Sequence, residues 1–205
     1  IFIRPLEALV ILDRAQASGD SLRPFYGTAA WRFGEPTTRN GRRVPATQVV
    51  KTFLAHFETA PTLGGNVARA TIGNQQAEVL MLSPAAATRR VVAEGGPAGQ
   101  YRLEIDHSGT ADTYFLNVVY ARDSSEASIT ANLDETASQW TLNLTHPTRG
   151  SATIVLDKGM QSAGGSVRVG TDASMPLLDG QQAYSIDDAG PHWGPGDVTF
   201  ANGYE

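Results

Sequence analysis

A long polar segment, residues 22–47, holds the residue types best suited to binding an acidic sugar. It combines arginines with aromatic residues, namely Tyr26, Trp31, Arg32, Arg39, Arg42 and Arg43. Guanidinium groups bind carboxylates and sulfates through paired hydrogen bonds, and aromatic rings stack on sugar faces. We interpret the segment as a candidate carbohydrate-contacting surface, since loops of this length within a domain are often functional. The alternative is that Arg42-Arg43 is a solvated turn and Trp31 a plug beneath the loop.

Other titratable residues point less clearly to chemistry. We interpret Asp13 as an acceptor of backbone N–H bonds at a strand end and Arg14 as half of a structural ion pair. His107 and His146 stand in predicted turns, so we expect both to be exposed to solvent. A hydrolase site would need two convergent carboxylates, and no spacing pairs the available ones. The glutamates considered for such a pair are Glu35, Glu58 and Glu104.

The elements that must position these residues are strands. Tyr101, Leu103 and Ile105 alternate with Arg102 and Glu104, which is typical of a strand with one face in the core and one in water. Residues 140–145 alternate in the same way, and Gly- and Pro-rich turns separate the candidates. The other predicted strands are 8–13, 48–57, 66–72, 76–82, 88–94, 111–121, 127–133, 151–157 and 165–169.

No segment carries a helical stripe of ten or more residues, so the pattern predicts an all-β fold. We expect a large antiparallel β-sandwich of two layers and about ten or more strands. The sandwich is expected to span residues 1–170, with the polar loop at 22–47 as its largest interruption. Residues 171–205 lose the strand rhythm and are interpreted as an irregular tail, packed on the sandwich or forming a linker stub.

Composition excludes several classes of protein. The chain has 205 residues and a net charge of −5, whereas nucleic-acid binders present a basic surface. No apolar run approaches the ~18 residues of a membrane span. Cysteine is absent, so the chain has neither disulfides nor thiolate metal sites. Abundant Thr, Ser, Asn and Gly with few lysines suggest a secreted or periplasmic bacterial protein.

An ordered set of strands resembles a known family. Leu9–Arg14 and Lys51–Phe57 each form a buried-strand pattern carrying a charged or titratable group, and four further segments follow in the expected order. Those four segments are Pro61–Asn66, Ala77–Pro84, Tyr101–Ile105 and Phe115–Val119. Over residues 2–170 the set resembles the C-terminal β-sandwich domain of heparinase II/III-like (alginate lyase-like) polysaccharide lyases.

The resemblance implies a role in β-elimination of an acidic, uronate-containing polysaccharide. In that family the sandwich packs against a preceding helical toroid and lines one wall of the substrate cleft. The catalytic centre sits mainly on the toroid, which this chain lacks. We therefore expect the isolated chain to be inactive and to contribute substrate orientation and carboxylate binding, with its partners being the polysaccharide and a toroid domain or chain.

Several family members also bind zinc in the sandwich, and the resemblance maps that site onto three positions. His56 matches the first ligand, Asn74 falls where an acidic ligand is expected, and Asn117 falls where a second histidine is expected. Amides are poor zinc ligands, so we expect no cofactor. His56 is then an inward histidine bonded to a neighbour or a substrate contact, with metal binding as a weaker alternative.

A second hypothesis treats the chain as a stand-alone carbohydrate-binding or structural β-sandwich. The loss of the zinc ligands favours it, and the residues at 22–47 would then hold the glycan. The two hypotheses differ in an observable way. A module built to pack on a toroid exposes a wide apolar face when alone, whereas an independent module is a monomer in solution.

Overall fold

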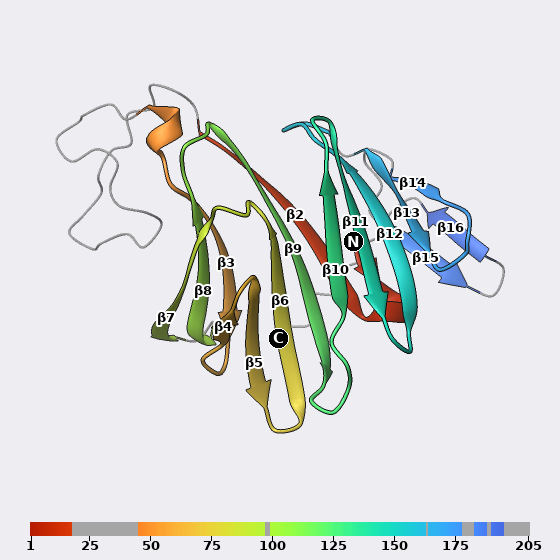
Figure 1. The fold of residues 1–205 in the computed structure, drawn as a ribbon, viewed down its shortest axis with the longest axis horizontal. Helices are drawn as coiled ribbons and strands as arrows, with labels where there is room; N and C mark the ends of the chain where they lie inside the picture. Colours follow the sequence, from red (N-terminus) through yellow and green to blue (C-terminus); the bar gives the residue numbers. More distant parts are fainter. Residues whose placement is uncertain (18–44, 97–98, 163, 178–182, 188–189, 195–205) are drawn as a thin grey trace. The chain divides into compact units, whose positions relative to one another are not determined.

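The computed structural model describes residues 1–17, 45–96, 99–162, 164–177, 183–187 and 190–194, and this part of the chain is almost entirely β (Figure 1). Two single 3-10 turns, Arg4–Leu6 (η1) and Ala46–Gln48 (η3), are its only helical elements. Every strand pairing is antiparallel. The prediction of an all-β antiparallel sandwich is confirmed. No helix of the described residues is long and apolar enough to cross a membrane.

The largest sheet has six strands in the order β1-β2-β9-β6-β5-β4. The strands are β1 (Phe2–Ile3), β2 (Ala8–Gln16), β9 (Asp112–Asp123), β6 (Gln75–Ser83), β5 (Val67–Ile72) and β4 (Thr62–Gly64). Strand β9 lies at its centre and is buried on both faces from Phe115 to Val118. A strand buried on both faces reads as an apolar run rather than an alternation; Phe115, Leu116 and Val118 fit that pattern, and Asn117 is a buried polar exception.

A three-stranded sheet forms the second layer, in the order β3-β8-β7. Its strands are β3 (Lys51–Phe57), β8 (Gly99–His107) and β7 (Thr88–Gly96). Alternate residues of β3 and β8 meet alternate residues of β5, β6 and β9 in one apolar core. The core includes Phe57, Leu103 and Ile105 from the small sheet, and Ala68, Ala70, Val79, Met81 and Phe115 from the large one.

A five-stranded sheet accounts for most of the remaining chain, in the order β10-β11-β12-β13-β14. Its strands are β10 (Thr130–Glu135), β11 (Gln139–His146), β12 (Gly150–Asp157), β13 (Gly165–Val169) and β14 (Met175–Leu177). Trp140, Leu142 and Leu144 are buried at alternate positions of β11. Gly165 has φ +136° and a Cβ there would collide with the backbone of Val155, so the β12–β13 pairing requires glycine.

The chain divides into two units by its internal contacts. One comprises Ile1–Ala131 with Leu144–Ser151, and the other Asn132–Asn143 with Ala152–Glu205. The region predicted as an irregular tail, residues 171–205, contains β14 and a hairpin of β15 (Ala183–Asp187) with β16 (Gly190–Gly194).

Candidate functional site

Of the side chains singled out for substrate binding, His56 is the one that the structure describes. Tyr26, Trp31, Arg39, Arg42 and Arg43 lie outside the described residues. His56 stands on β3, where Phe53, Ala55 and Phe57 point into the core between the two layers. Since successive side chains of a strand point to opposite faces, His56 lies on the outer face of the three-stranded sheet.

That outer face carries most of the charged side chains of the three-stranded sheet. Residues directly opposite one another in antiparallel strands share a face, and the register places His56 opposite Arg102, Leu54 opposite Glu104 and Thr52 opposite Asp106. Strand β7 adds Arg90, which lies opposite Glu104. We call this set the outer-face network; its side chains are Thr52, His56, Arg90, Glu94, Arg102, Glu104 and Asp106.

The outer-face network begins at a histidine–glutamate pair. His56 Nε2 lies 3.1 Å from a carboxylate oxygen of Glu94, and the histidine side chain is 37% exposed. The other oxygen of Glu94 accepts a hydrogen bond from Arg102. A Cβ added at Gly99 on β8 would lie only 3.3 Å from the His56 Cβ and 3.0 Å from the Phe57 carbonyl oxygen, so the strand beside His56 favours glycine at this position. His56 is therefore held from one side and open to solvent on the other.

From Arg102 the network continues to the far end of the sheet. Arg102 Nε donates to Glu104 at 2.8 Å, Glu104 also accepts from Arg90, and Arg90 reaches Asp106 at 3.3 Å. Asp106 in turn accepts a 2.6 Å hydrogen bond from Thr52. Acidic and basic groups thus alternate along the sheet, with Glu104 and Arg102 almost fully buried beneath their neighbours.

The surroundings of Glu104 favour its ionised form. Burial opposes its ionisation, but hydrogen bonds from Arg102 and Arg90 outweigh burial and hold the pKa of Glu104 below its ordinary value. Glu94 and Glu104 do converge on Arg102, and the sequence alone did not pair them. A glycosidase-type general acid needs a raised pKa, whereas the pKa of Glu104 is lowered.

A second network lies on the opposite side of the sandwich, over the six-stranded sheet. Glu78 is fully buried and binds Arg69 at 2.7 Å, Arg122 at 3.0 Å, and the hydroxyl of Ser128. Burial again opposes ionisation, and hydrogen bonds from Ser128, Arg69 and Arg122 outweigh it and lower the pKa of Glu78. We call this the Glu78 network. It ties β5, β6 and β9 to the loop after β9.

The three positions that the resemblance maps to zinc ligands face three different environments. His56 is on the outer face described above. Asn74 is exposed in the β5–β6 turn, and its carbonyl accepts a hydrogen bond from Ser124 N. Asn117 is fully buried on β9, with neither amide atom hydrogen-bonded. No group of three or more His, Cys, Asp or Glu among the described residues is arranged to hold a metal ion.

The two histidines predicted to be exposed behave differently. His146 is buried at 3% exposure, so that prediction is wrong. Its Nδ1 accepts from the backbone N–H of Thr148 and Arg149, and its Nε2 donates to the carbonyl of Ala127. A histidine that caps a tight turn becomes buried by the turn itself. His107 is partly buried and lies 3.2 Å from the Thr113 hydroxyl.

Sequence reasoning missed most of the outer-face network. The alternation of Arg102 and Glu104 was visible, but it was interpreted only as the polar side of a strand. Arg90 and Glu94 were not singled out, because their positions opposite β8 depend on the register of β7. The signal that could have found Arg90 and Glu94 is a pattern of opposite charges on strands predicted to be neighbours, since such charges pair across a sheet.

Comparisons of the chain with protein-family models, curated proteins and solved structures find no match.

Proposed function

We propose that this chain is the C-terminal β-sandwich module of a heparinase II/III-like polysaccharide lyase. It would line the cleft for an acidic, uronate-containing polysaccharide that the enzyme cleaves by β-elimination. One observation carries the proposal. The strands behind the family resemblance are neighbours in space: β2, β9 and β6 adjoin in the six-stranded sheet, and β3 pairs with β8 in the other layer. The resemblance therefore follows a contiguous part of the sandwich.

The module's role is substrate binding, and the catalytic acid and base belong to a helical toroid. β-Elimination requires a base for the C5 proton, an acid for the leaving oxygen and a cation for the carboxylate. The surroundings of the buried carboxylates Glu78 and Glu104 lower their pKa values, which makes both poorly suited to the role of the acid. Secretion or export to the periplasm would bring the enzyme to such a polysaccharide.

The carboxylate-binding groups are assigned to the polar segment and the strand that follows it. Tyr26, Trp31, Arg39, Arg42 and Arg43 supply stacking and guanidinium contacts. His56 lies on β3, shortly after that segment, and its exposed ring is available to a sugar hydroxyl or carboxylate. In the outer-face network Arg90 and Arg102 already bind carboxylates, so they are less suited to an anionic ligand than the arginines at 39–43.

The test measures binding and elimination on this chain. Isothermal titration against an alginate or heparin-type oligosaccharide should show binding that weakens with salt, and an Arg42→Ala, Arg43→Ala double variant should bind several-fold more weakly. Arg168→Ala, on β13, is the control and should bind as the parent does. Ultraviolet absorbance should detect no unsaturated uronate. Equal affinity for a neutral glucan would overturn the acidic-substrate assignment, and product formed by this chain alone would overturn the non-catalytic role.

The alternative is a stand-alone carbohydrate-binding or structural module. The observation that favours it concerns the positions that the resemblance maps to zinc ligands. Asn117 is buried in the core and Asn74 lies in an exposed turn, so the two do not form one metal site. Both hypotheses predict glycan binding, so affinity alone does not separate them. The mass of the native polypeptide that contains this chain separates the two hypotheses, because only the lyase requires a toroid.

A further inference from the structure

The chain has two lysines, Lys51 and Lys158, and the structure holds them in opposite ways. Lys158 donates to the Glu135 carboxylate at 2.6 Å and to a backbone carbonyl. Its ammonium also lies 4.7 Å from the centre of the Trp140 ring. A carboxylate and an aromatic face both stabilise a positive charge, so the contacts of Lys158 favour its protonated form.

Lys51 is buried, and its contacts are different. Its ammonium donates to the backbone carbonyl of Thr110, and it forms no ion pair with the carboxylates of the described residues. Asp112 favours the charge of Lys51 through space, but burial opposes that charge more strongly and lowers the pKa of Lys51. A desolvated lysine that gives up its proton easily can act as a nucleophile.

Lys51 lies at one end of the core between the two layers. The register of β3 and β8 places it opposite His107, and it shares a face with Phe53, which packs on the core two residues further along. Thr113 has the corresponding place on β9, two residues before the buried Phe115. The rings of Phe53 and Phe115 have centroids 6.2 Å apart. The core therefore changes from aromatic to polar at this end, where Lys51, His107 and Thr113 gather.

A chain of hydrogen bonds places the proton of the His107 ring. The Thr110 hydroxyl donates to the backbone carbonyl of Asp112, so its oxygen is left to accept from the Thr113 hydroxyl, 3.3 Å away. The Thr113 oxygen then accepts from Nδ1 of His107 at 3.2 Å. This arrangement puts one proton in each of the three contacts. The neutral His107 ring therefore carries its lone pair on Nε2, which makes no hydrogen bond to a described residue.

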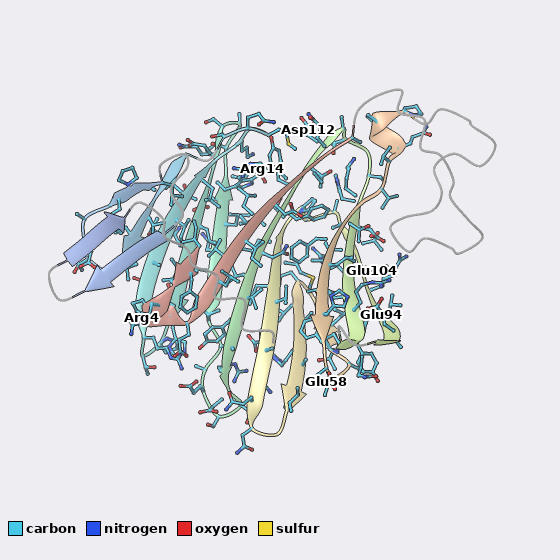
Figure 2. All side chains as sticks on the ribbon, turned by 180° about the vertical axis from the view of Figure 1, so that it is seen from behind. Arg4, Arg14, Glu58, Glu94, Glu104 and Asp112 are labelled. Atoms are coloured by element: carbon cyan, nitrogen blue, oxygen red, sulfur yellow. The ribbon has the colours of Figure 1, made fainter. Side chains whose placement is uncertain are left out.

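The surroundings of His107 favour this neutral ring. Burial, and to a smaller extent the charge of Lys51, lower the pKa of His107. A base and an amine thus lie opposite each other on neighbouring strands, close to solvent. His107 is half-buried, and Thr110, whose carbonyl binds the Lys51 ammonium, is exposed. Asp112 begins strand β9 at the same end and is labelled in Figure 2.

We propose that Lys51 is a nucleophilic amine that forms an imine with a small aldehyde, assisted by His107. His107 Nε2 takes one proton from the Lys51 ammonium, and the free amine attacks the carbonyl carbon. A second proton moves from nitrogen to the carbonyl oxygen, the proton held by His107 joins it there, and the oxygen leaves as water. A protonated imine remains on Lys51, and His107 is neutral again.

The nearby charge selects among aldehydes. The exposed Asp112 carboxylate acts on the Lys51 amine, so an uncharged aldehyde is favoured over an anionic one. The inference does not depend on the proposed function, because the cluster would have the same chemistry in a stand-alone module.

The first test traps the imine on the full chain. The protein is incubated at neutral pH with glyceraldehyde and cyanoborohydride, which reduces an imine to a stable amine. Peptide mapping by mass spectrometry then measures the adduct at each lysine. Lys51 should be modified roughly ten-fold faster than Lys158, the internal control, as expected for a pKa difference of about one unit. Equal rates, or modification of Lys158 alone, would overturn the proposal.

A second test asks whether His107 assists the reaction. His107→Gln retains a donor toward Thr113 but lacks a base, so the Lys51 adduct should form several-fold more slowly, while the Lys158 rate stays the same. Circular dichroism checks that the variant is folded. An adduct at Lys51 that forms as fast as in the parent protein would remove His107 from the proposal.

The third measurement uses the parent protein and needs no variant. Acetylation of the two lysines is followed against pH, and the Lys51 profile should lie at lower pH than the Lys158 profile. A lysine with a purely structural role would not show this displacement. Coincident profiles, or a Lys51 that resists acetylation at every pH, would contradict a nucleophilic Lys51.

Discussion

The two charged networks of the sandwich share one design and differ in how they end. Each centres on a buried carboxylate held by two arginines: Glu78 by Arg69 and Arg122, and Glu104 by Arg90 and Arg102. In the Glu78 network, Arg122 also donates to the carbonyls of residues 123, 124 and 126, so its Arg122 end lies inside the protein, while Arg69 at the other end is 44% exposed on its side chain. The outer-face network ends at the half-exposed His56.

From this difference we propose a structural role for the Glu78 network and a binding role for the outer-face network. The hydrogen bonds from Arg122 to backbone carbonyls fix the loop after β9. A network that ends at a partly exposed histidine can change its partner at that end while its inner ion pairs stay in place. Glu94 and Glu104, both labelled in Figure 2, are the two carboxylates that hold Arg102 at the inner part of this network.

The largest expected effect is the loss of the Glu78 carboxylate. Glu78→Gln leaves Arg122, which is 8% exposed on its side chain, as a buried cation without its counter-charge. Breaking a buried ion pair on one side costs about 3–5 kcal/mol, so urea unfolding should show a loss of that order. Glu58→Gln, an exposed change on the same sandwich, is the control. A loss below about 1 kcal/mol would show that the network is not structural.

Glu104→Gln should cost less, about 1–3 kcal/mol in the same measurement. Arg102 keeps Glu94 as a partner, and Arg90 is 57% exposed on its side chain and can turn to water. Comparing the two variants sharpens the contrast between the networks. A loss of unfolding free energy equal to or larger than that of Glu78→Gln would mean that the outer-face network contributes at least as much to stability as the Glu78 network.

Acid should weaken the protein through both carboxylates. Their folded-state pKa values lie below the ordinary 4.5, so their stabilisation is present above that pH and is lost as pH falls through the folded values. The free energy of unfolding should therefore drop as pH falls below the ordinary value of 4.5. The Glu78→Gln, Glu104→Gln double variant should show a shallower drop, and an unchanged slope would contradict the assignment.

The smallest effect is expected at the open end of the outer-face network. His56→Gln retains a donor toward Glu94, and Glu94 keeps Arg102, so stability should change by no more than about 0.5 kcal/mol. Glycan affinity should fall several-fold in the same variant if His56 contacts the ligand. Titration calorimetry measures the glycan affinity of this variant, and urea unfolding measures its stability. A fall in stability without a fall in affinity would make His56 a structural residue.

Most of the fold could be predicted from the sequence, because two-residue alternation is a local property. The strands at 101–105 and 140–145 appear where the pattern placed them, within β8 and β11. The predicted strand at 48–57 begins instead at Lys51, since residues 46–48 form a 3-10 turn. Short edge strands such as β1 and β4 carry too few residues to show a period.

The outer-face network could not be predicted in the same way, because it depends on register. Arg90 meets Glu104 only through the alignment of β7 with β8, and an alternation pattern does not fix that alignment. Burial of His146 depends equally on the turn after β11, which folds its own backbone N–H groups onto the ring. In both cases the missing information is which residue lies beside which.

The most direct test of the proposed function is made on the native polypeptide that contains this chain. Its mass should be measured, and its elimination activity on uronate polysaccharides should be compared with that of the 205-residue chain. We predict a longer polypeptide with a helical region that generates unsaturated uronate, while the 205-residue chain generates none. A native polypeptide without such a region, or one with no elimination activity on any uronate polysaccharide, would contradict the lyase assignment.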